Sequence, residues 1–76
     1  MLEKCTEAGL RMTSQRVLIA NTLEQSLDHP DADEIYRRSN AIDSTISIAT
    51  VYRTLGIFER AGLIQKVTVG DGRSHY

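Results

Sequence analysis

Apolar residues recur with helical spacing between Ser47 and Gly62. At about 100° per residue, one stripe of this stretch holds Ile48, Val51, Leu55 and Phe58. The opposite stripe holds Ala49, Arg53, Gly56 and Arg60, flanked by Tyr52 and Thr50. Ser47 suits an N-cap, and Gly62 can adopt the left-handed conformation that ends a helix. The pattern predicts a short helix with one core face and one face that combines small residues with arginines.

The outer face of this helix suits a polyanion. Small neighbours permit close approach, and the Arg53 guanidinium can form a bidentate hydrogen bond to guanine in a major groove. An ordinary solvated arginine face is the alternative. The helix alone leaves both interpretations open, and the flanking sequence favours a recognition helix.

The preceding sequence predicts three more helices. They run from Leu2 to Ala8, stopped by Gly9; from Thr13 or Ser14 to about Gln25; and from Asp31, where Asp31 and Glu34 form an acidic capping box. Residues 41–46 are expected to form a turn. The third helix, this turn and the helix after Ser47 make a helix-turn-helix.

After Gly62 the period of the pattern changes to two. Alternation from Leu63 to Val69 predicts a strand, residues 70–72 (Gly-Asp-Gly) predict a turn, and residues 73–76 begin a return strand. A hairpin behind a recognition helix is the wing of a winged helix domain. The fold class expected for residues 1–76 is therefore mostly α with a small β-hairpin: a winged helix-turn-helix of about four helices and a two-stranded wing. Because the return strand stops at Tyr76, we expect more protein to follow it.

Composition narrows the function. The 76 residues have room for one domain, and no apolar run approaches the length of a membrane span. No secretory signal is visible, so a cytoplasmic protein with no membrane partner is expected. The single cysteine, Cys5, is expected to be buried on the first helix. No nucleophilic triad and no zinc-ligand spacing is present, which argues against an enzyme and a small-molecule substrate.

The net charge of −1 is unusual for a DNA-binding chain, but the charge is unevenly distributed. Residues 48–76 carry four basic and two acidic side chains, whereas residues 29–47 carry two basic and four acidic ones. The positive segment coincides with the predicted recognition helix. It is a weak electrostatic footprint, so tight binding would require more than one copy of the domain.

Four motifs together resemble a known family. They are residues 9–16 (GLRMTSQR), 29–38 (HPDADEIYRR), 48–55 (IATVYRTL) and 70–76 (GDGRSHY). In this order and spacing they look like the N-terminal DNA-binding domain of the ferric uptake regulator (Fur) family.

The resemblance implies a cytosolic, homodimeric, metal-dependent transcription regulator, usually a repressor. Such proteins bind AT-rich palindromic operators in double-stranded DNA when loaded with Fe(II), Mn(II) or Zn(II). Their dimerisation domain and most metal ligands follow the wing, so a C-terminal dimerisation and metal-binding domain is expected after Tyr76. The metal sensed, the operator and the direction of regulation stay open.

The resemblance also assigns roles to residues. Tyr52 and Arg53 match the pair that contacts thymine methyls and guanine, and Arg11 stands where a basic residue, commonly lysine, enters the minor groove. Residues at positions suited to phosphate contact are Thr13, Gln15, Arg16, Ser47 and Thr50. His29 matches a histidine that joins ligands from beyond the wing in a regulatory metal site. Gly56 replaces a larger residue, which questions the rigidity of the helix.

Reasoning from the residues alone qualifies two of these roles. Arg16 lies in a first helical turn, so it is expected to contact phosphate and to affect all DNA sequences alike. Without the resemblance, His29 before Pro30 is a turn residue. With too few ligands in the chain, this fragment is expected to bind no metal. A protein-interaction role for the winged helix is the alternative to DNA binding.

Overall fold

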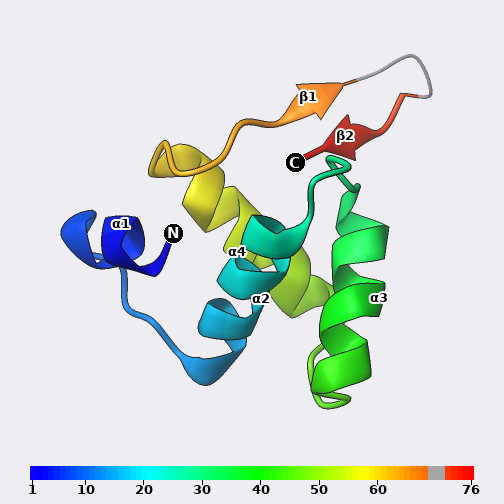
Figure 1. Ribbon diagram of the computed structural model, residues 1–76, viewed down its shortest axis with the longest axis horizontal. Coiled ribbons are helices and arrows are strands. Elements are labelled where there is room, and N and C mark those ends of the chain that lie inside the picture. The colour runs from blue at the N-terminus through cyan, green and yellow to red at the C-terminus, as the bar shows by residue number, and fades with distance from the viewer. Residues whose placement is uncertain (69–71) are drawn as a thin grey trace.

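Three helices form the body of the molecule (Figure 1). The computed structural model describes residues 1–68 and 72–76. Its elements are α1 (Leu2–Glu7), α2 (Ser14–Gln25), α3 (Ala32–Ile42), α4 (Ile48–Arg60), β1 (Val67–Thr68) and β2 (Ser74–His75). α3 packs against both α2 and α4, and α1 lies beside α2. The mostly helical prediction is confirmed, and no helix in the described ranges is long and apolar enough to span a membrane.

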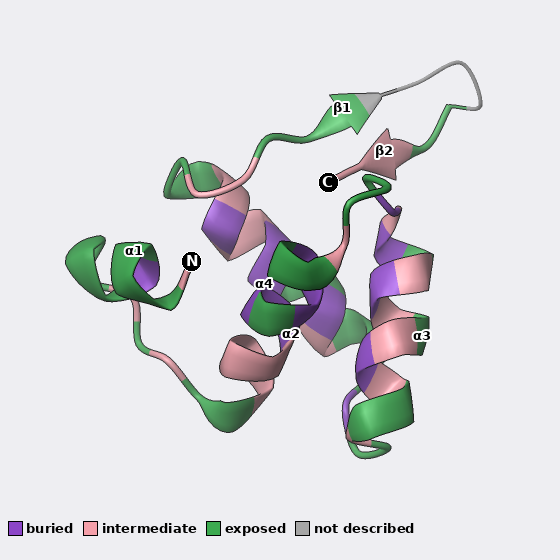
Figure 2. Cartoon of the chain, viewed as in Figure 1, coloured by how far each residue is buried: buried purple, intermediate pink, exposed green. Residues whose placement is uncertain are grey.

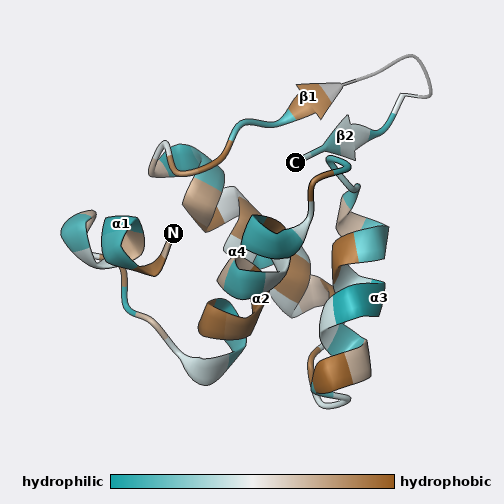
Figure 3. Ribbon diagram, viewed as in Figure 1, coloured by the Kyte–Doolittle hydropathy of each residue, from teal (hydrophilic) through white to brown (hydrophobic). Residues whose placement is uncertain are grey.

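The core lies where the inner faces of α2, α3 and α4 meet (Figures 2 and 3). Its fully buried members include Ile19 from α2, Ile35 from α3 and Phe58 from α4. Ile48 was expected in this core but is 38% exposed. Ile46, directly before the α4 N-cap, is buried instead and joins Val51 in the core, which is the arrangement of a hydrophobic staple. The first residue of α4 is therefore left at the surface.

Side chains cap the three long helices where the sequence predicts it. Thr13 Oγ1 accepts the Arg16 amide at 3.2 Å, and Asp31 Oδ1 accepts the Glu34 amide at 2.9 Å. Ser47 Oγ accepts the Thr50 amide at 3.1 Å. Each cap satisfies a backbone donor that the helix itself cannot satisfy. These caps fix where α2, α3 and α4 begin.

The turn between α3 and α4 is shorter than predicted. Residues 41 and 42 continue α3, so the connection begins at Asp43. Asp43 Oδ1 accepts the Thr45 amide at 3.0 Å and the Thr45 hydroxyl at 2.6 Å. These bonds lower the pKa of Asp43. An aspartate that bonds two residues ahead forms a compact turn by itself, and this turn places α4 against α3.

The strand predicted from Leu63 begins only at Val67. Gly62 has a φ of +75°, its amide donates to the Glu59 carbonyl at 3.0 Å, and the Leu63 amide donates to the Phe58 carbonyl at 2.9 Å. This is a Schellman motif, which ends α4 and uses the Leu63 amide. Leu63 consequently packs against the core as part of the helix end rather than of a strand.

The two strands lie over the start of α3 (Figure 1). β1 and β2 pair antiparallel, with Val67 opposite His75 and Thr68 opposite Ser74. The turn predicted at residues 70–72 falls largely on residues 69–71, which are outside the described ranges. His75 also forms a bridge with Asp31, and the Tyr76 amide donates to the Pro30 carbonyl at 3.0 Å. β2 is therefore held between β1 and the segment that precedes α3.

Candidate nucleic-acid interface

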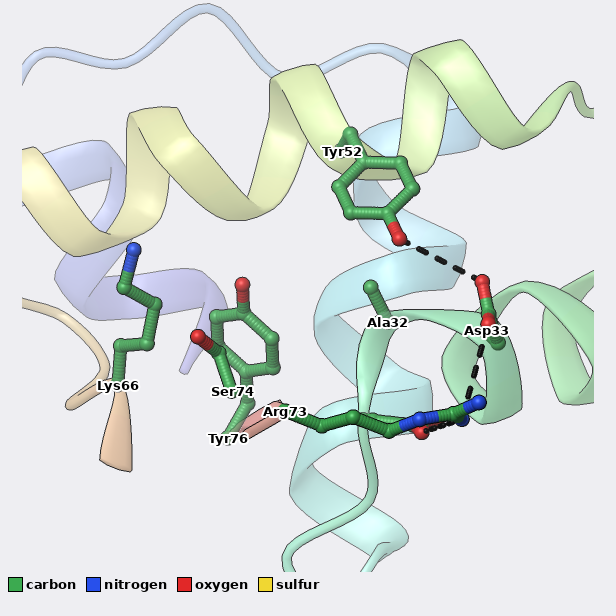
Figure 4. Close-up of a pocket in the computed structure, with 8 residues that line it drawn as sticks. Ala32, Asp33, Tyr52, Lys66, Arg73, Ser74 and Tyr76 are labelled. Atoms are coloured by element: carbon green, nitrogen blue, oxygen red, sulfur yellow. Dashed lines mark hydrogen bonds and ion pairs between the residues drawn. The ribbon is translucent and has the colours of Figure 1, made fainter. Parts of the chain in front are cut away.

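Tyr52 projects from one flank of the buried stripe of α4, on the side that faces the first turn of α3. Its side chain is 53% exposed, whereas the adjacent Val51 is fully buried. The Tyr52 hydroxyl donates a long hydrogen bond, 3.4 Å, to Asp33 Oδ1 on the first turn of α3 (Figure 4). This contact orients the ring along the surface between α4 and α3.

An open hollow of about 370 Å³ lies beside Tyr52, between the start of α3 and β2 (Figure 4). Arg73 spans it: Nη1 lies 2.7 Å from Asp31 Oδ2 and 3.8 Å from Asp33 Oδ2. The Glu34 amide and, secondarily, Arg73 lower the pKa of Asp31. Because Arg73 offsets these two carboxylates, less negative charge remains next to Tyr52 to repel a polyanion.

Three exposed arginines make no ion pair or hydrogen bond through their side chains to any residue in ranges 1–68 and 72–76: Arg11, Arg53 and Arg60. The two arginines of α3 and the arginine directly before β2 are paired: Arg37 binds Glu34, Arg38 binds Asp28 and Glu34, and Arg73 binds Asp31. Arg53 and Arg60 lie on the outer face of α4. A guanidinium without a protein partner retains its donors for phosphate or base edges.

Gly56 lies under one of these arginines. A Cβ built on Gly56 would stand 3.2 Å from Arg60 Nη1, tighter than an ordinary contact. α4 continues unbroken through Gly56, so the glycine does not interrupt the helix. It lets the Arg60 side chain lie close to the helix backbone.

The residues predicted to contact phosphate gather at two helix starts, which both lie at the lower end of Figure 1. Thr13 caps α2 and Ser47 caps α4, with the Thr50 hydroxyl 2.9 Å from Ser47 Oγ. Gln15 and Arg16 lie in the first turn of α2 and are half-buried. Helix starts present unpaired amides and a positive dipole end, which favour anions. Arg16 Nη1 also donates a hydrogen bond to the Arg11 carbonyl at 2.8 Å. Sequence reasoning did not predict this contact.

His29 stands apart from these groups, before α3. It is exposed and has a φ of +49°, and its carbonyl accepts a hydrogen bond from His75 Nδ1 at 2.8 Å. Within ranges 1–68 and 72–76, no three His, Cys, Asp or Glu side chains are placed to hold a metal ion. A closed site needs about four ligands, so the described residues do not fit a resident metal by themselves. Cys5 is fully buried in the core, and burial raises the pKa of its thiol.

The sequence matches the Ferric uptake regulator family over residues 7–76. The chain belongs to this family. It is 58% identical over 74 residues to the ferric uptake regulation protein of Rhizobium leguminosarum bv. viciae, covering 97% of this chain and 52% of that protein. It is 40% identical over 75 residues to the peroxide operon regulator of Bacillus subtilis, covering 99% and 52%.

Solved structures of this family have the same fold. A structure described as a zinc-bound manganese uptake regulator is 57% identical, with a TM-score of 0.95, and the match covers 97% of this chain and 56% of that one. The resemblance to the DNA-binding domain of the family is thereby confirmed, and so is the prediction that this is not an enzyme. The chain spans about half the length of these relatives.

Proposed function

We propose that this chain is the winged helix-turn-helix DNA-binding domain of a metal-responsive transcription regulator. α4 enters the major groove of operator DNA, where Arg53 bonds guanine and Tyr52 contacts thymine methyls. The observation that carries this proposal is the outer face of α4. Exposed arginines with no side-chain partner in the described part of the chain stand there beside an exposed tyrosine, while the opposite face fills the core. β1 and β2 act as the wing.

Contacts to the minor groove and to phosphates complete the interface. Arg11 enters the adjacent minor groove, whose negative potential is strongest where A·T pairs narrow it. The capped starts of α2 and α4 contact phosphates through Thr13, Gln15, Arg16, Ser47 and Thr50. Phosphate contacts fix the register of the protein, and the base contacts then supply sequence preference.

The longer protein is a cytoplasmic homodimer that binds AT-rich palindromic operators and represses genes for the uptake of a metal such as iron, manganese or zinc. Its C-terminal domain follows Tyr76 and joins two copies of this domain. One domain neutralises few phosphates, and two domains at half-site spacing gain affinity through effective concentration. Fusing this chain to a dimerising coiled coil should therefore recover at least about tenfold in affinity without metal.

His29 contributes one ligand to the regulatory Fe(II), Mn(II) or Zn(II) site of the longer protein, and the remaining ligands come from the C-terminal domain. Bound metal fixes the orientation of the two DNA-binding domains in that protein. Within this chain, the backbone around His29 is held by His75 and Tyr76 of the β2 segment, so its position is coupled to the wing.

Selection from a randomised double-stranded DNA library tests the proposal. The chain should enrich AT-rich duplexes that keep a guanine at one position, and Arg53→Ala should lose the preference at that position. Arg37→Ala is the matched control, since Arg37 is an exposed arginine paired with Glu34. A library that stays random after selection would contradict DNA reading and favour the protein-interaction alternative.

A further inference from the structure

The segment between α1 and α2 displays Arg11 to solvent. Leu10 and Met12 are half-buried and pack against the core, whereas Arg11 and Thr13 are exposed. Two apolar anchors, one on each side of Arg11, therefore direct its side chain outward.

Both ends of this segment are tied to helices. The Gly9 amide donates to the Thr6 carbonyl at 3.0 Å, and the Leu10 amide donates to the Cys5 carbonyl at 3.1 Å, which ends α1 in a second Schellman motif. At the other end, Thr13 caps α2. The peptide between Arg11 and Met12 lies between these two fixed points.

Arg16 holds this segment from inside α2. Its amide donates to Thr13 Oγ1 at 3.2 Å, and its guanidinium Nη1 donates to the Arg11 carbonyl at 2.8 Å. The second bond is charge-assisted and short, and such bonds are about twice as strong as neutral ones. One residue thus fixes both the start of α2 and the backbone of the residue proposed to enter the minor groove.

We infer that Arg16 is a positioning residue that sets the minor-groove specificity of Arg11 through the hydrogen bond to its carbonyl. The inference rests on the proposed function, because it assumes that Arg11 enters the groove. Minor-groove reading depends on groove width, so an arginine presented from a fixed backbone discriminates narrow grooves better than one on a loose segment. A backbone ordered in advance also loses less entropy on binding.

The bond itself can be tested without DNA. Trypsin cleaves after arginine and must unfold the local backbone to do so, so the Arg11–Met12 bond is protected when Arg16 holds the Arg11 carbonyl. Limited digestion followed by mass spectrometry should show cleavage after Arg11 rising at least about fivefold in Arg16→Ala, with cleavage after Lys4 unchanged. Equal cleavage after Arg11 in both proteins would overturn the inference whatever the DNA measurements show.

The specificity is tested with two duplexes, the one selected by the chain and a copy in which adenines of its A·T run are replaced by 2,6-diaminopurine. This base adds an amino group to the minor groove and keeps the major-groove edge of adenine. The measured quantity is the ratio of the two dissociation constants. We expect a ratio of about 10 for the chain, about 1 for Arg11→Ala and below about 3 for Arg16→Ala.

A double variant separates positioning from phosphate contact. If Arg16 acts on specificity only through Arg11, Arg11→Ala/Arg16→Ala should keep the ratio of about 1 expected for Arg11→Ala, and any further loss that is equal on both duplexes reports the phosphate contact of Arg16. Arg37→Ala should keep the ratio of about 10, which controls for the loss of one positive charge. Thermal unfolding of each variant checks that it is folded.

The alternative outcomes are distinct. If Arg16→Ala weakens binding to both duplexes by the same factor and keeps the ratio, Arg16 is a uniform phosphate contact and the inference is wrong while the proposed function stands. If Arg11→Ala keeps the ratio, or if no duplex is selected, Arg11 does not read the minor groove, and that part of the proposed function fails together with the inference.

Discussion

Replacing Arg53 by alanine should remove sequence preference without affecting the fold. The Arg53 guanidinium is exposed and has no ion pair among residues 1–68 and 72–76, so the change leaves no carboxylate unpaired. Alanine also favours helix, and the free energy of unfolding should change by less than about 0.5 kcal/mol. A bidentate arginine–guanine contact is worth about 1–3 kcal/mol, so affinity for the selected duplex should fall roughly 5- to 150-fold.

Fluorescence anisotropy at low salt measures this effect. Labelled selected and scrambled duplexes are titrated with the chain, Arg53→Ala and Arg37→Ala. Affinity for the scrambled duplex should change by less than about threefold in Arg53→Ala, because a base contact contributes little to random DNA. Equal losses on both duplexes would show that Arg53 binds phosphate and would refute its role in reading guanine.

Three further predictions concern stability and metal. Phe58→Ala should lower the free energy of unfolding by about 3–5 kcal/mol in chemical denaturation, because it empties the centre of the core. The bonds from Thr45 lower the pKa of Asp43 in the folded state, so the stability they add is present above the ordinary aspartate pKa of about 3.9 and is lost as the pH falls below it. The melting temperature of Asp43→Asn should therefore drop less between about pH 5 and pH 3 than that of the parent chain. An identical drop in the two proteins would contradict this prediction. Calorimetric titration of the chain with Mn(II) or Zn(II) should give no stoichiometric site, and a tight site lost in His29→Ala would overturn that expectation.

Local signals predicted the helices well because their causes lie within a few residues. Asp31 and Ser47 cap where expected, each by accepting an amide three residues ahead. Gly62 ends α4 through its positive φ. Such interactions depend on neighbouring side chains and on backbone conformation, both of which are readable in the sequence.

Competition between local patterns produced the errors. Apolar and polar residues do alternate from Leu63, but the Leu63 amide already donates to the Phe58 carbonyl at the end of α4. The strand therefore begins only at Val67. Ile48 fits the helical stripe, but Ile46 occupies the core before the helix begins. Hydrophobic periodicity indicates which face of a helix is apolar, but it does not indicate which of two nearby apolar residues is buried in the core.

The contacts that organise the candidate interface had no sequence signal. Tyr52 meets Asp33 across 19 positions and Arg73 meets Asp31 across 42. Such pairs follow from the packing of α3 against α4 and of β2 against the start of α3. The same packing decides which arginines are paired: Arg37 and Arg73 contact carboxylates, whereas Arg53 has no carboxylate partner among residues 1–68 and 72–76.

Chemical-shift mapping of the ¹⁵N-labelled chain during titration with the selected duplex tests the central claim most directly, and it works even when one domain binds weakly. The claim is that the outer face of α4, together with the N-terminal ends of α2 and α4, forms the DNA interface. The largest shift changes should fall on residues 11–16 and 47–60, with the exposed residues of α1 and the exposed side chains of Leu27 and Ile42 unchanged. Changes concentrated on α1 or around Leu27, with α4 unaffected, would contradict the account.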